Sequence, residues 1–577
     1  AGAGATTWKA RTIAPMALHL ARAALLENAN VCLHRTHGFA YLPGSGLKGM
    51  ARAWAEMAWL DEDKPEAQAM IERVFGKLEE SGAVVFHDAW PTTWPELEVD
   101  ILACHHPKYY SGDGAPGDWE SPNLVNFLVV KAGAEFDFAL SPRPGVGTDE
   151  DVKLARMFLE GALARRGAGA KTNAGYGYFA AGKETPAATG KEAKLSFTCE
   201  LELVTPAFLA GAGQSREDCD LRGATLRGQL RWWWRTLHAG HLRPDALRQL
   251  EEAIWGSSSK GGAVSVRVEA AAENKDRVKL APFKKLIAGK NGMQQVMDNA
   301  FCARHGIVLG ADNKTTPGLS YLAYGMDEYS TRTQTRKQRA CMEAPAYWLL
   351  SIECRDTIVD GTSIPAEMVR RQALAALGLL VQRGAVGSRS RKGFGSLQAH
   401  DKSGELAALK APECAAELRK AIGHDGLRLA CADTPWIEEM KAFEAPIRAG
   451  TAWQAMHIVG CVLRDYASSL KHDAEKLRLG LPRQIHGPRP QALQHQVNHT
   501  PPLKLGGLKA PAKGEGRHPA PLFFSLKPHN KGFLVRVTFF PDALLQHEGK
   551  QPDLQASKQF VLRTLVALQK GFLAHKP

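Results

Sequence analysis

Apolar and polar residues alternate along several segments in the middle of the chain. The alternation is regular at 195–203 and again at 264–268, and a shorter apolar pattern follows at 348–352. A period of two is typical of half-buried strands. Helices are predicted from about Thr225 and after Pro365. The order strand, helix, strand, strand, helix, strand indicates a ferredoxin-like module.

A three-part signature occurs twice along the chain in the same order. Each copy has a glycine loop that opens a helix, a glycine turn that feeds a strand, and a glycine-rich loop that follows an apolar helical stretch. The first copy lies at 43–52, 74–86 and 167–179, and the second at 221–235, 254–266 and 384–395. One glycine motif is weak evidence, but three in matched order predict two divergent copies of one module.

The expected fold class is α+β, with tandem ferredoxin-like (RRM-like, βαββαβ) domains that carry insertions. The segment 183–194 is rich in Gly, Pro, Ala and Lys, which is typical of a linker. We therefore expect a first domain at 1–182 and a second at 195–400. A third, degenerate domain with helical insertions is expected at 401–577.

Individual elements are expected in the two outer domains as well. In the first, strands are expected at 82–87 and 127–140 and a helix at 152–163. In the third, a strand is expected at 533–539, helices near 453–470 and 559–573, and a long loop at 488–515.

The net charge of the chain indicates the kind of partner to expect. The 577 residues carry 73 Lys and Arg against 60 Asp and Glu, a net charge of +13. Such an excess favours a polyanionic partner such as nucleic acid. No uncharged apolar run approaches the roughly 18 residues of a membrane-spanning helix, and the N-terminus has no secretory pattern. We expect a cytoplasmic protein without a membrane partner.

The ten cysteines are scattered and form no CxxC pair. This spacing favours neither a zinc ribbon nor a disulfide framework. Cys32, His34 and His37, with 104–106, fit no strong zinc pattern. No metal site and no cofactor are expected.

The glycine loops and the basic residues beside them are the candidate RNA contacts. Backbone N–H groups at a helix start attract phosphate, and arginine can bind phosphate or stack on bases. The candidates are Gly44, Ser45, Gly46, Lys48, Arg52, Lys171, Thr172, Tyr176, Arg222, Arg227, Arg231, Arg235, Arg336, Arg389, Arg391, Lys392 and Phe394. The alternatives are core roles for two of Trp232, Trp233 and Trp234, a structural salt bridge for Arg231, and plain tight turns for the glycines.

Through 43–49 and 167–179 the sequence resembles the RAMP superfamily of type III CRISPR effectors. Up to about Gly182 it resembles the sixth subunit of the Cmr (type III-B) complex, also through 106–110, 118–119 and 122–123. From about Lys194 it is similar to the first Cmr subunit, through Thr205-Pro206, 226–235, Trp255-Gly256, 321–325 and 387–395. The resemblance implies a fusion of two subunits that are usually separate.

The resemblance also implies a function. Such a chain would cap the end of an antiviral ribonucleoprotein that holds the 3′ part of the guide crRNA, contact target RNA, and assemble with backbone, small and Cas10-type subunits. In backbone subunits of this superfamily, cleavage relies on an aspartate in the loop before the glycine turn. The corresponding segment 28–40 holds Asn28, Asn30, His34 and His37 but no aspartate. Asp218 and Asp220 in the second copy are expected to pair with Arg216 and Arg222. The resemblance therefore implies no catalysis.

Two other functions remain open. RAMP-type nucleases can cleave RNA without a metal by acid and base catalysis, for which His34 or His37 could serve. Alternatively, the chain could be a protein–protein adaptor that makes no contact with RNA.

Overall fold

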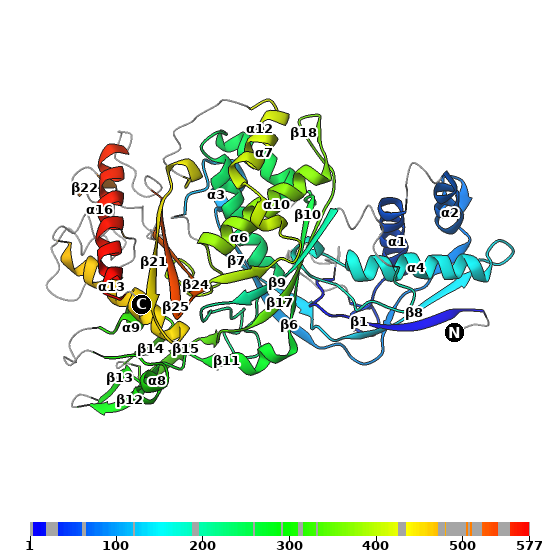
Figure 1. Ribbon diagram of the computed structural model, residues 1–577. Helices are drawn as coiled ribbons and strands as arrows, with labels where there is room; N and C mark the ends of the chain where they lie inside the picture. The colour runs from blue at the N-terminus through cyan, green and yellow to red at the C-terminus, as the bar shows by residue number, and fades with distance from the viewer. Residues whose placement is uncertain are drawn as a thin grey trace.

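The computed structural model describes residues 4–18, 33–59, 65–118, 122–186, 195–257, 260–289, 292–309, 316–330, 333–424, 434–470, 479, 504–505, 508–509, 522–540 and 554–575. It consists of three modules that follow one another along the chain and across the molecule (Figure 1). Most of the expected linker at 183–194 and the expected loop at 488–515 lie outside the described residues.

The second module has the six elements that the sequence pattern predicts. They are β9 (Ser196–Leu203), α6 (Gly223–His238), β10 (Val264–Ala270), β17 (Tyr347–Cys354), α10 (Ala366–Arg383) and β20 (Leu397–His400). The sheet order is β10-β17-β9-β20. The first and third strands are thus central, as a ferredoxin-like fold requires. The alternating apolar residues of β9 face α6 and α10, so Leu201 and Leu203 are fully buried.

The first module repeats this arrangement in a shorter form. Its elements are β1 (Thr6–Arg11), α1 (Gly44–Ala58), β4 (Val84–Phe86), β5 (Trp90–Pro91), β8 (Glu135–Pro142) and α4 (Asp149–Arg165), and α2 (Pro65–Phe75) packs beside α1. The order β1-β8-β4 matches three strands of the second sheet, and the last strand is reduced to one bridge between Thr12 and Phe179. The strand expected at 127–140 is two strands, because the chain turns at Gly133, where φ is +93°.

A long hairpin leaves the first module and reaches the second. It consists of β6 (Leu97–Cys104), α3 (Pro107–Ser111) and β7 (Asn123–Val130). In Figure 1, α3 lies beside α7 (Pro244–Trp255) of the second module, far from α1 and α4. Phe127 and Val129, on one face of this hairpin, are buried with Tyr176. The first two modules are therefore held together by a segment of the first.

The third module has five of the six elements, in the same order. They are β21 (Lys441–Arg448), α13 (Ala452–Ser469), β24 (Leu522–His529), β25 (Gly532–Phe539) and α16 (Leu554–Leu573). The sheet order β21-β25-β24 corresponds to that of the other modules. The expected strand and both expected helices are present.

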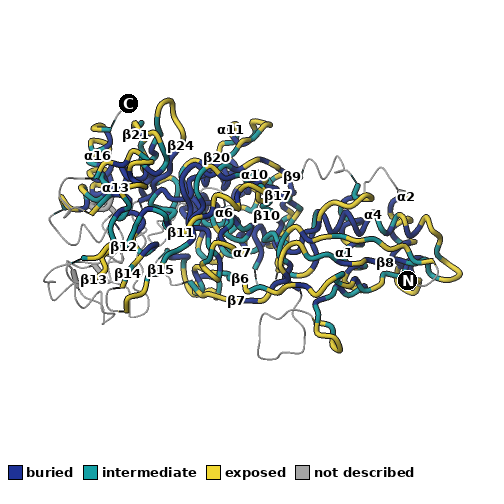
Figure 2. Tube along the Cα trace, turned by 90° about the horizontal axis from the view of Figure 1, so that it is seen from below, coloured by how far each residue is buried: buried dark blue, intermediate teal, exposed yellow. Residues whose placement is uncertain are grey.

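Packing crosses the boundary expected at residue 400 in both directions. The insertion helices α8 (Asn299–Arg304) and α9 (Gly318–Leu322) contribute to the core of the third module. Helices α11 (Glu405–Ala408) and α12 (Ala411–Ala421) instead pack with α6 and α10. Figure 2 shows buried positions gathered inside the modules and exposed positions along the outer edges.

The remaining strands form small antiparallel pairs at the edges of the modules. They are β2 (Gly76–Lys77) with β3 (Glu80–Ser81), β11 (Val278–Leu280) with β16 (Ala340–Met342), β12 (Lys284–Gly289) with β13 (Gly292–Met297), β14 (Asp327–Ser330) with β15 (Thr335–Gln338), β18 (Thr357–Val359) with β19 (Thr362–Ile364), and β22 (Lys504–Leu505) with β23 (Leu508–Lys509). The predicted α+β class is confirmed.

The two glycine-rich loops close in the same way, which shows the internal repeat at atomic detail. Ala168 donates its N–H to the carbonyl of Gly177 at 2.8 Å, and Val386 donates to Gly395 at 2.9 Å. Both glycines have a left-handed backbone, with φ of +76° and +77°. A Cβ atom at either position would overlap the carbonyl oxygen of the residue across the loop. These glycines are required by the backbone itself.

Candidate nucleic-acid interface

The first glycine loop opens directly into helix α1. The N–H of Gly44 donates to Asp88 Oδ1 at 2.7 Å, which ties the helix start to the segment after β4. A side chain at Gly44 would overlap the carbonyl of Phe86. Ser45 and Gly46 are exposed, and the first-turn N–H groups of a helix have no partner within it. The start of α1 is therefore open to an anion.

Three cations gather beside this helix start. The pKa of Lys48 is lowered by burial and by the neighbouring charges of Arg143 and Arg52. Arg52 pairs with Glu56 at 2.7 Å, and Arg143 donates to the carbonyl of Gly82 at 2.8 Å. Among the described residues, neither Lys48 nor Arg143 pairs with a carboxylate. A phosphate would relieve this repulsion.

The second glycine-rich loop of the first module offers fewer groups than expected. Lys171 is exposed, with its ammonium group 5.1 Å from the centre of the Phe127 ring, and Thr172 is half-buried. Tyr176 is buried and donates its hydroxyl hydrogen to Asp100 Oδ2 at 2.6 Å. Lys171 and Thr172 remain available to RNA, whereas Tyr176 is part of the core between modules.

The arginine stripe of α6 faces inward. Arg231 and Arg235 donate to the Glu251 carboxylate at 2.7 and 2.9 Å, and Glu251 is fully buried. Tyr109 and Tyr110, from the hairpin of the first module, donate to the same carboxylate at 3.0 and 2.9 Å. Arg231 and Arg235 therefore join two modules in this structure, and we leave them out of the proposed RNA contacts.

Arg227 differs from the other arginines of α6. It donates to the carbonyl of Trp255, and its Nε has no hydrogen-bond partner. Its pKa is lowered to about 9 by burial and by Arg231. Among the described residues, Arg227 is the arginine of this stripe without a carboxylate partner.

Two further candidate arginines also pair across the module junction. Arg222 binds Asp100, the same carboxylate that Tyr176 binds. Arg391 pairs with Asp118 at 2.6 Å, and Trp232 donates its indole N–H to that carboxylate at 2.9 Å. The carboxylates of these pairs come from the first module and the arginines from the second.

The remaining candidates are held by contacts within the second module and, for Lys392, by a contact with the third. Arg336 makes a two-pronged pair with the buried Asp327, at 2.9 and 2.8 Å. Arg389 donates to the carbonyl of Tyr324, and Lys392 lies in a bridge with Phe524. Phe394 has no exposed surface and packs on Phe208, so its expected stacking on RNA does not fit this structure.

The residues considered for catalysis have structural contacts. His34 Nδ1 accepts the backbone N–H groups of Thr36 and His37 at 3.3 and 3.2 Å, which fixes the turn. Asn28 and Asn30 lie outside the described residues.

The two aspartates of the second copy also bind backbone and indole groups. Asp218 accepts the N–H groups of Gly213 and Ser215 at 2.7 and 2.9 Å, and Asp220 accepts the indole N–H of Trp348 at 2.7 Å. The salt bridges expected with Arg216 and Arg222 are replaced by these bonds.

The family model described as the RAMP superfamily matches residues 27–180 and 200–398, more than half of the chain. The chain belongs to the RAMP superfamily. The two matched segments end and begin on either side of the linker expected at 183–194. The repeated signature thus corresponds to two RAMP segments within one chain.

Comparison with individual RAMP proteins gives two different relatives. The chain is 37% identical over 122 residues to the CRISPR system Cmr subunit Cmr6 of Pyrococcus furiosus, covering 20% of this chain and 35% of the relative. It is 36% identical over 72 residues to Cmr subunit Cmr1-2 of the same organism, covering 12% and 37%. It thus spans about a third of the length of the curated relatives that it matches. The crystal structure of apo Cmr1 from this organism is 16% identical, with a TM-score of 0.37, covering 64% of this chain and 96% of that one.

Sequence reasoning missed the anionic half of the junction between the RAMP modules. Glu251, Asp100 and Asp118 lie 16 or more residues along the chain from the arginines that they bind. The signal available in the sequence was the segment 106–118, which carries two tyrosines and two aspartates, one of them Asp118. Its role became visible only when the hairpin was placed against α6 and α7.

The buried groups of this junction make the stability of the RAMP chain depend on pH. The pKa of His106 is lowered to about 3 by burial and by Arg235. Burial alone would raise the pKa of Glu251 and of Asp118, but the adjacent arginines outweigh it and hold both at about 2. All three folded-state pKa values lie below the unfolded values. Their stabilisation is fully present above about pH 6.5 and is lost as the pH falls toward 2.

We therefore expect the urea midpoint to fall steadily from about pH 7 to about pH 4. His106→Asn should remove part of the slope between about pH 6.5 and 4.5, where an unfolded histidine titrates. Asparagine tolerates the left-handed backbone at this position, where φ is +68°. A flat profile for the unmodified chain would contradict this assignment.

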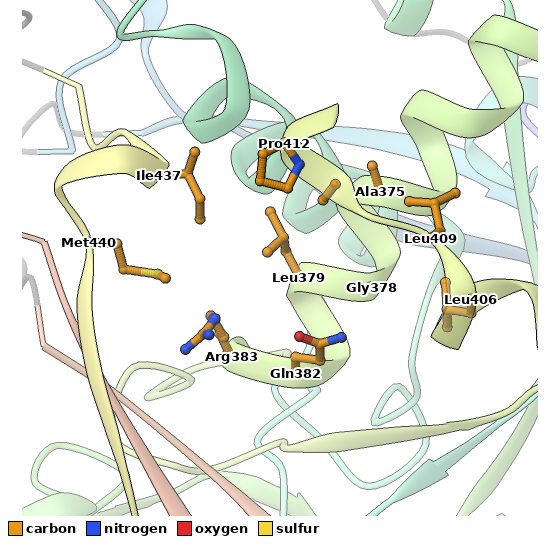
Figure 3. Close-up of a pocket in the computed structure, with 11 residues that line it drawn as sticks. Ala375, Gly378, Leu379, Gln382, Arg383, Leu406, Leu409, Pro412, Ile437 and Met440 are labelled. Carbon is orange, nitrogen blue, oxygen red and sulfur yellow. The ribbon is translucent and has the colours of Figure 1, made fainter. Parts of the chain in front are cut away.

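A small cleft in the second module is lined mainly by apolar side chains. It has a volume of about 220 Å³ and lies between α10, α11, α12 and residues 437–440 (Figure 3). Leu379, Leu406 and Met440 line it, with Arg383 at one end. It offers neither a nucleophile nor a general acid and base pair.

Two features are absent from the described part of the chain. No helix there is long and apolar enough to cross a membrane. Within the same residues, no group of three or more His, Cys, Asp or Glu side chains could hold a metal ion.

Proposed function

We propose that this chain is a non-catalytic RNA-binding capping subunit of a type III CRISPR effector, in which its two RAMP segments act as one unit. It would hold the 3′ part of a guide crRNA, contact target RNA, and assemble with backbone, small and Cas10-type subunits. The family membership and the matches to two Cmr subunits support a role in such a complex. The observation that carries RNA binding is the gathering of Lys48, Arg52 and Arg143 beside the open start of α1.

The contacts between the first two modules support the proposal that they act as one capping unit. The hairpin of the first module is bound through Glu251, Asp118 and Asp100 to the second. Guide contacts on the two modules would therefore keep a fixed spacing. Lys48, Arg143 and Lys171 on the first module and Arg227 on the second are the cations that we propose for phosphate binding.

RNA binding is tested by the salt dependence of affinity. Each phosphate contact releases counterions, so log K falls linearly with log salt. Replacing both Lys48 and Arg143 by alanine should weaken binding of a single-stranded RNA to the full chain about tenfold or more and reduce the slope by about 2. Fluorescence anisotropy from about 50 to 300 mM salt measures both quantities.

The matched control replaces two exposed lysines of the same module, Lys77 and Lys153, which pair with Glu80 and Glu150. The control should leave affinity and slope nearly unchanged. Equal slopes for the test variant and the unmodified chain would overturn the RNA contact and favour the adaptor function.

Catalysis is tested separately with repeat RNA and with guide-matched target. We expect neither RNA to be cut, because the loop at 33–40 offers no carboxylate and His34 holds its own turn. Site-specific cuts that disappear in His37→Ala would instead establish the nuclease alternative.

A further inference from the structure

A cluster of aromatic rings lies on the surface of the first module. It consists of His34, His37, Phe39, Tyr41, Trp90 and Trp94, here called the ring platform. Neighbouring rings stack with centroids 4.8 Å apart for His34 and His37, and 5.6 Å apart for Tyr41 and Trp90. Of these six residues, only the two histidines were candidates from the sequence, for catalysis.

Local backbone contacts fix the platform. The turn at 33–40 is closed by a bridge between Leu33 and Ala40 and by the N–H of His34, which donates to the carbonyl of Phe39 at 2.7 Å. Trp90 lies in β5, which pairs with β8. The platform is thus built on the sheet of the module.

The platform is open to solvent at one end. Trp94 is 71% exposed and Trp90 is 38% exposed. An exposed group of aromatic rings that contact one another is uncommon on a soluble protein and marks a binding surface. Phe39, half-buried between them, contacts both indoles.

The platform continues into the cationic start of α1. Tyr41 precedes the loop at 43–46, and Leu42 pairs with Ala89, next to Trp90. Asp88, two residues before Trp90, binds the N–H of Gly44. The rings therefore adjoin the cluster of Lys48, Arg52 and Arg143.

Exposed aromatic rings next to cations match the two halves of a nucleotide. Aromatic side chains stack on bases, and cations bind the phosphates between them. A paired duplex would hide its base faces, so the platform suits bases that are unpaired. The cations beside the rings favour RNA over an apolar protein segment.

We propose that the ring platform stacks unpaired RNA bases while the start of α1 holds the adjoining phosphates. This inference rests on the proposed function, since it specifies how the first module would hold RNA. Trp94 and Trp90 would provide the exposed ring faces on which bases stack, and Phe39 would pack against both indoles.

The experiment compares two RNAs with the full chain. One is a 12-nucleotide oligoadenylate of about the length that one binding groove holds, and the other has the same backbone with about four central abasic positions. We expect Trp94→Ala to weaken binding of the oligoadenylate about tenfold, with an unchanged salt slope, and to have little effect on the abasic RNA. Trp94→Phe should restore most of the affinity, because it keeps a ring.

A matched control is Leu78→Ala, which removes another exposed apolar side chain of the same module, 91% exposed. Thermal unfolding verifies that each variant folds. We expect Trp94→Ala to fold, because most of the Trp94 side chain is exposed. Equal losses on both RNAs would overturn base stacking.

Two further outcomes separate this inference from the proposed function. Unchanged RNA binding in Trp94→Ala, with loss of a co-purifying effector subunit, would reassign the platform to a protein partner while RNA binding through Lys48 stands. Absence of any salt-dependent RNA binding by the unmodified chain would overturn both.

Discussion

Replacing Glu251 by alanine is expected to lower the free energy of unfolding by about 3 to 5 kcal/mol. The fully buried carboxylate binds Arg231 and Arg235 of its own module and Tyr109 and Tyr110 of the first module. Without it, two largely buried guanidinium groups keep their charge and lose their counterion. Urea-induced unfolding, followed by tryptophan fluorescence, measures the loss.

The neighbouring acid on the same helix provides the control. Glu252 pairs with Arg248 at 3.7 Å, and both side chains are 29% exposed. Glu252→Ala should therefore cost less than about 1 kcal/mol. A protease site placed in 187–194 gives a second readout, since the cut parts should stay together in the unmodified chain and separate in Glu251→Ala. Equal effects of the two substitutions would show that the buried network contributes nothing to docking.

Gly177→Ala and Gly395→Ala should each destabilise the chain by about 2 to 4 kcal/mol. Both glycines have a left-handed backbone that alanine adopts at a cost, and the added Cβ would overlap a carbonyl oxygen across the loop. The loops cannot move away without breaking the hydrogen bonds of Gly177 to Ala168 and of Gly395 to Val386. Chemical denaturation of both variants measures the effect.

Gly46 and Gly49 provide the contrast within the same family of glycine loops. They lie in α1, and a Cβ at either position would have open space around it. Alanine there should be neutral or should stabilise the helix by up to about 1 kcal/mol. Similar losses of stability at positions 46, 49, 177 and 395 would mean that these loops do not need glycine for its left-handed backbone.

These expectations separate two kinds of glycine that look alike in the sequence. Those at 177 and 395 are required by the backbone of each module, whereas Gly46 has open space around it at the start of α1. A loss of RNA affinity in Gly46→Ala without a loss of stability would assign that position to binding. The repeated glycine motifs thus indicate a shared fold, and only their exposed positions are candidates for a binding site.

Much of the fold was predictable because it rests on local pattern. Alternation at 195–203 and 264–268 fixed which residues face the helices, and the matched glycine motifs identified the repeat. The strand expected at 127–140 was wrong in extent because the pattern did not reveal the turn at Gly133. The packing of α8 and α9 with the third module depends on contacts between distant segments.

The candidate site was predictable only in part, because a basic side chain has the same letter whether it faces solvent or a buried acid. Lys48 and Arg52 keep exposed surface beside an open helix start, while Arg231 and Arg235 turn toward Glu251. No local pattern distinguishes α1 from α6, since both helices begin with glycine and carry cations one turn apart.

By itself, the sequence determined the α+β class, the repeated module, the excess of positive charge and the membership of the RAMP superfamily, since these depend on composition and on neighbours along the chain. The tertiary structure decided which cations are neutralised by carboxylates and which remain for a polyanion. It also brought Phe39 and Trp94 together on one surface. The physical reason is that both outcomes depend on how far apart in space two side chains lie, and sequence separation does not fix that distance.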